Sequence, residues 1–189
     1  MRSLVAPCLL LAALAATAHA DGPCPRVTAP HDPVCRPFAA MLLPTAFAGI
    51  YQPRGDLGTW MGGGLEAVLP AWSDNSPAFG PSQGKVRFDV GLYRSTKDGM
   101  GLMTTYRGGA QVSFERNASR AWLIPYFAAD VGGQWRDGHH GFVDGGGGLY
   151  LLHRRSAIID LEVTYQIPFS QTDDLSGLRM RLAASFALW

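Results

Sequence analysis

Hydrophobic and polar residues alternate along much of this chain, with the period of two that is typical of a β-strand. The clearest segment runs from 157 to 167, where Asp160 and Glu162 share one face and Leu161 and Val163 share the other. Because successive side chains of a strand point to opposite sides of its sheet, this segment predicts one polar and one apolar face. The same division is found in three further segments, at 85–93, 106–115 and 178–186.

Weaker strand candidates occupy the intervals between these four segments, at 58–69, 126–135 and 142–152. Clusters of turn-forming residues separate the candidates at the spacing of hairpins, at 95–99, 116–119 and 137–141. Pro125 and Pro168 have no N–H to donate to a ladder, so we expect them at strand ends or bulges. The four glycines at 145–148 would make a poor isolated strand, but inside a closed barrel they leave room for long neighbouring side chains.

The apolar stretch from Thr45 to Tyr51 is the candidate for an eighth strand. The alternative is a short segment that precedes or plugs the barrel. An even number of strands brings both ends of a closed meander to the same side, so eight strands are preferred. We therefore expect an all-β fold, a closed antiparallel up-and-down β-barrel of eight strands. In this arrangement the connection from 71 to 84 is a long loop on the side where turns are usually short.

The charged residues of the predicted strands lie on the polar faces. If those faces line a narrow lumen, opposite charges on neighbouring strands pair there and offset the desolvation cost of each ion. The alternative is that they are solvated residues on the wet face of a soluble sheet. An eight-stranded lumen is too narrow for an open channel. The predicted inner face holds five basic and seven acidic residues: Glu66, Lys85, Arg87, Asp89, Arg107, Glu115, Asp130, Asp144, Asp160, Glu162, Arg179 and Arg181.

The first twenty residues have the layout of a secretory signal peptide. A basic residue precedes an apolar run, and Ala18-His19-Ala20 forms a small-x-small cleavage site. A transmembrane helix is the alternative, but the apolar run is shorter than the ~20 residues that span a bilayer. We therefore expect a signal peptide at 1–20, a Pro-rich N-terminal segment at 21–43 and the barrel at 44–189.

Two cysteines, Cys24 and Cys35, lie in the Pro-rich segment of this predicted exported chain. An oxidising compartment favours one disulfide between them. A zinc site is the alternative, but the two thiols and His31 lack a second clear donor nearby, so we expect no metal.

Composition narrows the classes of function. The chain has 23 Gly, 13 Pro and 11% aromatic residues, which favours short strands and turns over helices. A formal net charge of +1, with 16% charged residues, argues against a nucleic-acid partner and against disorder. The sequence has no phosphate-binding glycine loop, and we expect no cofactor.

Aromatic residues gather near the ends of the predicted strands, where a membrane barrel carries its interfacial girdles. They are Trp60, Trp72, Tyr93, Trp122, Trp135, Tyr150, Phe169 and Trp189. With its signal peptide, paired strands and terminal aromatic residue, the chain resembles the small eight-stranded outer-membrane β-barrels of Gram-negative bacteria, over most of residues 58–189. The resemblance implies a place in the cell outer membrane, contact with outer-membrane lipid, and Trp189 as the C-terminal signal that the barrel-assembly machinery reads.

The leading functional hypothesis is an integral outer-membrane barrel without catalytic activity. Loops near 52–57, 136–141 and 169–177 would face an envelope partner, and the role would be structural, adhesive or that of a subunit in an envelope machine. One alternative is a secreted soluble barrel that binds a small apolar ligand. Another is a lipid A-modifying enzyme, which needs a His beside a Ser or an acid at the lipid-facing rim. Its candidate residues are His139, His140, His153, Ser156 and Asp160.

Overall fold

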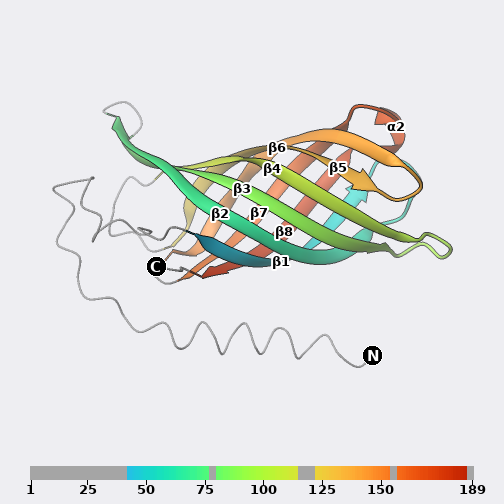
Figure 1. Cartoon of the computed structure of the whole chain (residues 1–189), viewed down its shortest axis with the longest axis horizontal. Coiled ribbons are helices and arrows are strands. Elements are labelled where there is room, and N and C mark those ends of the chain that lie inside the picture. The colour runs from blue at the N-terminus through green and yellow to red at the C-terminus, as the bar shows by residue number, and fades with distance from the viewer. Residues whose placement is uncertain (1–41, 77–79, 115–121, 154–156, 187–189) are drawn as a thin grey trace, which may run out of the picture.

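The computed structural model of the chain is a closed antiparallel β-barrel (Figure 1). It describes residues 42–76, 80–114, 122–153 and 157–186. Each strand pairs with its neighbours in the sequence, and β1 closes the barrel by pairing with β8. The strands are β1 (Leu43–Pro53), β2 (Trp60–Ser76), β3 (Gly80–Ser95), β4 (Leu102–Phe114), β5 (Ile124–Trp135), β6 (His139–His153), β7 (Ala157–Pro168) and β8 (Gly177–Phe186).

The predicted fold, an eight-stranded up-and-down barrel, is confirmed. The eighth strand, expected at 45–51, is β1, which runs along β2 from Leu43 opposite Val68 to Tyr51 opposite Trp60. The two prolines also lie where the missing N–H predicts, at the second residue of β5 and at the last residue of β7. Neither therefore interrupts a ladder in the middle of a strand.

The expectation of a long loop at 71–84 was wrong. β2 and β3 continue through most of this stretch as a hairpin, and their ladder extends to Ser76 opposite Gly80. A bulge between Pro70 and Trp72 accommodates the proline, which cannot donate to the ladder. The sequence shows no alternation here because the hairpin extends beyond the barrel (Figure 1), where no closed interior selects one face.

The two ends of the barrel differ. The β1–β2, β3–β4, β5–β6 and β7–β8 connections lie at one end, which we term the loop end. β1 begins and β8 ends at the opposite end, the terminus end, where the β2–β3 hairpin projects (Figure 1). A short helix, α2 (Thr172–Leu175), lies in the β7–β8 connection and buries Leu175. No helix in the described segments has the length and hydropathy that crossing a bilayer requires.

Glycines on the inner face let aromatic rings lie against the barrel wall. A Cβ added at Gly148 would stand 2.4 Å from Cζ of Tyr126, and one added at Gly64 would stand 2.8 Å from Cζ of Phe47. Gly145 of the same glycine run is exposed, and the nearest atom to a Cβ added there is 3.8 Å away. Within the glycine run of β6, the Tyr126 ring therefore requires a glycine at position 148, whereas position 145 has room for a side chain.

Gly148→Ala should destabilise the barrel by about 1–3 kcal/mol, because its methyl group would overlap the Tyr126 ring and the carbonyl oxygen of Leu161. Gly145→Ala is the matched control. It should be neutral or slightly stabilising, because the added Cβ meets ordinary contacts and Ala restricts the unfolded chain. Urea unfolding of both variants gives the comparison, and equal stabilities would contradict the packing of Tyr126 on Gly148.

Candidate functional site

The barrel carries its charged strand residues inside. Arg87, Arg179 and Glu162 are each 1% exposed, although all three belong to residue types that seldom lie fully inside a protein. Glu115, predicted with them, lies outside the described residues. The buried charged residues of the strands are Glu66, Lys85, Arg87, Asp89, Arg107, Asp130, Asp144, Asp160, Glu162, Arg179 and Arg181.

Arg87 on β3 is the centre of a buried ion cluster. Its guanidinium pairs with Asp130 of β5 and with Glu162 of β7. Its Nε donates to Oδ1 of Asp130 at 2.8 Å, and its Nη1 donates to Oε1 of Gln111 at 3.4 Å. Because β3 and β7 lie on opposite sides of the barrel, these contacts connect the walls across the lumen.

Two further arginines complete the ion cluster. Arg107 on β4 donates from Nε to Oδ2 of Asp89 at 2.8 Å and from Nη1 to Oδ2 of Asp144 at 3.2 Å. Arg181 on β8 donates from Nη1 to Oε2 of Glu66 at 2.5 Å. Its Nε lies 3.1 Å from Oε1 of Glu162, the β7 carboxylate that also pairs with Arg87. The three arginines therefore link carboxylates of β2, β3, β5, β6 and β7.

Tyrosines and apolar side chains fill the lumen on the terminus side of the ion cluster. The hydroxyl of Tyr126 donates to Oδ1 of Asp160 at 2.7 Å, and Nζ of Lys85 donates to the hydroxyl of Tyr150 at 2.7 Å. The Tyr150 ring stacks between those of Tyr126 and His153, with centroid distances of 4.8 and 5.0 Å. The apolar cluster at this end consists of Leu43, Val68, Ile124, Tyr126, Ala128, Tyr150 and Ile158.

On the loop side of the ion cluster, Arg179 is buried among aromatic rings. Its guanidinium carbon lies 5.3–5.7 Å from the centroids of Tyr51, Tyr93 and Phe142, within the range of cation–π attraction. Its Nη2 donates to Oε1 of Gln166 at 2.6 Å. The Tyr51 hydroxyl donates to the backbone carbonyl of Leu175 in the β7–β8 connection. The side chains around Arg179 are therefore joined directly to the loop end.

These three layers fill the lumen with side chains, as expected for a barrel of eight strands. Burying an ion costs several kcal/mol, and the ion pairs offset this cost only while both partners are present. The described residues contain no group of three or more His, Cys, Asp and Glu that could hold a metal ion. What this arrangement can do is hold strands on opposite sides of the barrel together from within.

The outer face of the barrel is apolar along its height. Leu65 of β2 is 72% exposed, and Phe127 of β5 is 67% exposed. Among strand residues with described side chains, Arg94, close to the loop end, is the one exposed charged residue. All eight strands contribute large exposed apolar side chains, including Ile50, Leu65, Val90, Tyr106, Phe127, Leu149, Leu161 and Met180. This polarity is the inverse of that of a water-soluble protein.

Three of the aromatic residues predicted for the outer girdles lie inside the barrel instead. Trp60, Tyr93 and Tyr150 are each 1% exposed. They share the inward positions of the charged residues, because alternation and not nearness to a strand end decides which face a side chain occupies. Trp122, Trp135 and Phe169 are exposed, and their place in a membrane girdle stays a prediction. The side chain of Trp72 and all of Trp189 lie outside the described structure.

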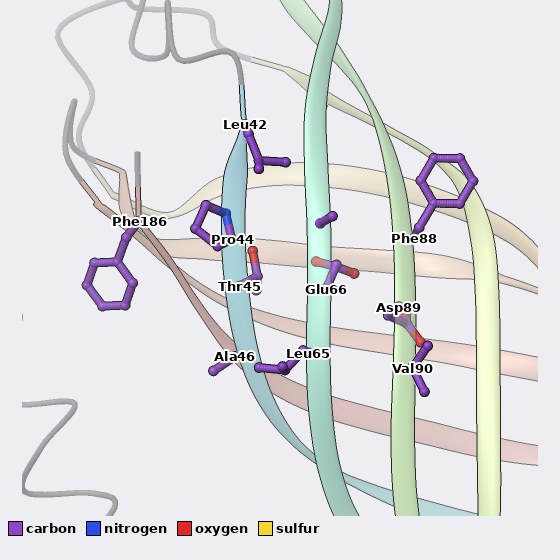
Figure 2. Close-up of a pocket in the computed structure, with 11 residues that line it drawn as sticks. Leu42, Pro44, Thr45, Ala46, Leu65, Glu66, Phe88, Asp89, Val90 and Phe186 are labelled. Atoms are coloured by element: carbon purple, nitrogen blue, oxygen red, sulfur yellow. The ribbon is translucent and has the colours of Figure 1, made fainter. Parts of the chain in front are cut away.

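An apolar groove with a volume of about 640 Å³ lies over β1, β2 and β3, near the terminus end. Figure 2 shows Phe186 and Phe88 on its two sides, with the smaller Ala46 and Pro44 between them. The remaining outward residues of the lining, Leu42, Leu65, Ala67 and Val90, are apolar as well. The groove is therefore a depression in the apolar wall, formed where small side chains stand between large ones.

The histidines considered for catalysis lie in different environments. At the loop end, Nε2 of His139 lies 2.6 Å from the hydroxyl of Tyr106 on β4, and Nδ1 of His140 lies 3.1 Å from Oγ of Ser170. His153 is buried at the terminus end of the same strand. Ser156 lies outside the described residues. The contact of His140 with Ser170 joins the start of β6 to the β7–β8 connection, and the sequence did not predict it because the two residues are far apart in the chain.

The connections at the loop end are tied to one another. Nζ of Lys97 lies 2.7 Å from the carboxylate of Asp56, which links the β3–β4 and β1–β2 connections. The backbone N–H of Arg54 donates to the carbonyl of Ser176 at 2.7 Å, which links the β1–β2 and β7–β8 connections. The N–H of Phe169 also donates to the carbonyl of Gly141 at 2.8 Å, so the three predicted outer loops, 52–57, 136–141 and 169–177, form one continuous surface.

No protein-family model, curated protein or solved structure matches this chain. Function is therefore inferred from geometry alone. Cys24, Cys35 and Trp189 lie outside the described residues, so the disulfide and the assembly signal stay predictions. The charge pattern did not single out the uncharged members of the lumen network, although they share its alternation: Gln111, Tyr126, Gln134, Tyr150 and Gln166.

Glu162→Gln should destabilise the folded barrel by about 3–5 kcal/mol, because it removes a buried negative charge that contacts Arg87 and Arg181. Asp56→Asn is the control. Its ion pair with Lys97 is exposed and screened by water, so the free energy of unfolding should hardly change. Both free energies can be measured by urea unfolding. A similar loss in the two variants would show that the ion cluster does not act as a buried interaction.

Proposed function

We propose that this protein is an integral β-barrel of the outer membrane of a Gram-negative cell, with a closed, charged lumen and a wall in contact with lipid acyl chains. The observation that carries the proposal is the inverted polarity: apolar side chains of all eight strands are exposed, while the charged strand residues with described side chains are buried, except for Arg94. This is the side-chain arrangement of a transmembrane barrel.

The free-energy cost of exposing such an apolar wall to water supports the proposed membrane environment. Apolar surface costs about 25 cal/mol for each Å² exposed to water, and soluble monomers rarely expose contiguous apolar patches of more than a few hundred Å². Because all eight strands contribute to the wall, a protein partner on one side would leave most of it wet. A bilayer surrounds the whole circumference. The closed ladder also leaves no sheet edge between β1 and β8, as hydrocarbon requires.

A soluble barrel that carries a small apolar ligand would need the opposite arrangement. Its cavity would be apolar and its outer face polar. Here the middle of the lumen is occupied by the ion cluster around Arg87, Arg107 and Arg181. The space in which such a ligand would bind is therefore filled with charged side chains, and we favour the membrane barrel over the ligand carrier.

A structural or docking role fits this barrel best, and we propose no catalysis. The ion cluster connects opposite strands through the lumen, and the linked connections form a surface at the loop end that an envelope partner or an adhesive contact could use. In this proposal residues 1–20 direct export and Cys24 pairs with Cys35 in the oxidising periplasm. Trp189 is then read by the barrel-assembly machinery.

Cell fractionation tests the proposed location. When the chain is expressed in a Gram-negative host, it should stay with outer-membrane vesicles during alkaline carbonate extraction. It should also migrate differently in unboiled and boiled gels, because a closed barrel resists unfolding by detergent at room temperature. Recovery of the folded chain in the soluble periplasmic fraction would exclude the membrane assignment and leave the fold unaffected.

Leu161→Arg should destabilise the barrel in a bilayer by about 2–4 kcal/mol, because the residue is on the outer face in the middle part of β7 and would place a cation in hydrocarbon. Leu178→Arg is the control, since it lies beside the loop end of β8, where the cost falls toward zero. Unfolding from phospholipid vesicles measures the difference. Equal tolerance at both positions would indicate that the wall faces water.

A further inference from the structure

β2 has a free edge at the terminus end of the barrel. The β1–β2 ladder starts with Leu43 opposite Val68, whereas β2 itself continues to Ser76. Within the described residues, positions 69–76 of β2 have β3 as their one strand partner. Figure 1 shows the hairpin projecting past the barrel at this end. Eight residues of β2 therefore have an edge without a neighbouring strand in the described structure.

The opposite edge of the hairpin is covered. β3 pairs with β4 as far as Ser82 opposite Phe114, so among the described residues it is the β2 side that lacks a neighbour over most of the projecting length. A free sheet edge carries a row of unpaired N–H and C=O groups, which accept an extended chain through main-chain hydrogen bonds. Alternate residues of 69–76 point their N–H and C=O groups to this edge, and the residues between them point toward β3.

We propose that residues 35–42, which directly precede β1, extend β1 along this free edge. Apart from Leu42, these residues lie outside the described structure. The chain enters β1 at the point where the free edge begins, so continued pairing needs no connecting loop. Tethering at this point gives the segment a high effective concentration at the edge, which a second copy or a separate protein lacks. Eight residues, 35–42, are the length needed to cover the eight positions 69–76.

The existing ladder fixes the register of the extension. Continuing it one position at a time places Leu42 opposite Leu69 and brings Cys35 to the position of Ser76, the last described residue of β2. The bulge at Ala71 can move the distant pairs by one position. In either register the predicted Cys24–Cys35 disulfide loop begins where the hairpin ends, so the disulfide would close the outer end of the extension. This inference does not depend on the membrane assignment.

Residue-resolved hydrogen exchange of the full chain in detergent micelles tests the extension. The variant combines Ala39→Pro and Ala40→Pro, which removes the N–H groups of two successive residues. Because successive N–H groups of a strand point to opposite sides, one of the two faces β2 in either register. The amides of residues 71–76 that face the free edge should exchange at least about tenfold faster in this variant than in the unchanged chain.

Ala29→Pro is the matched control, because it lies outside the proposed strand and should leave exchange at 71–76 unchanged. Amides of β5 report whether the barrel is folded in each variant. Fast exchange at 71–76 in the unchanged chain would mean that the edge is open, and the proposal would then be wrong. Slow exchange that survives the double proline variant would also overturn it, and particle size by light scattering would then show whether a second copy covers the edge.

Discussion

The structure depends on one constraint: eight strands close into a circle whose lumen is only wide enough for their own inward side chains. A buried polar group is costly unless it is paired, so each inward charged group needs a partner among the other inward groups. Arg87 meets this requirement by reaching from β3 to carboxylates on β5 and β7. Aromatic rings and apolar side chains then fill the space on both sides of the ions. The ion cluster is therefore the polar equivalent of a hydrophobic core, with high desolvation cost and strong pairing.

The same constraint sets the strand register. A slip of one residue in any strand would turn its charged side chains outward and its apolar side chains into the ion cluster. For β7, such a slip would replace Glu162 by Leu161 or Val163 beside Arg87, and the guanidinium would lose its partner on this strand. The apolar wall and the charged lumen therefore favour the same register, since it alone places apolar side chains outside and charged side chains inside. Because the buried charged groups of the lumen have partners within the barrel, the wall is left free to be apolar.

The sequence alone was sufficient for the strands within the barrel and for the inward face of their charged residues, because a period of two is a local signal that each strand repeats. It was not sufficient for the pairs that cross the lumen. Alternation tells which face holds Arg87 and Glu162, but their heights in the lumen depend on the stagger of four successive ladders. Trp60 and Tyr93 were misplaced because nearness to a strand end was given more weight than alternation. The β2–β3 hairpin was misread as a loop because a ribbon outside the barrel has no interior to impose a pattern on residues such as Ser73 and Asp74.

The seam between β1 and β8 explains why extra pairing at the terminus end matters. Closing the barrel pairs its first strand with its last, which are about as far apart in the chain as the fold allows. Because the entropic cost of closing a loop grows with its length, this pairing has the largest entropic cost. β1 has little to offset it on the outer face, where Ala46 and Ala48 are small. Inside, Thr45 donates to Oγ of Ser185 at 2.8 Å, and Arg181 lies over the Phe47 ring at 5.6 Å. A longer ladder with β2 would fix the position of β1 before β8 arrives, and so reduce the freedom lost when the seam closes.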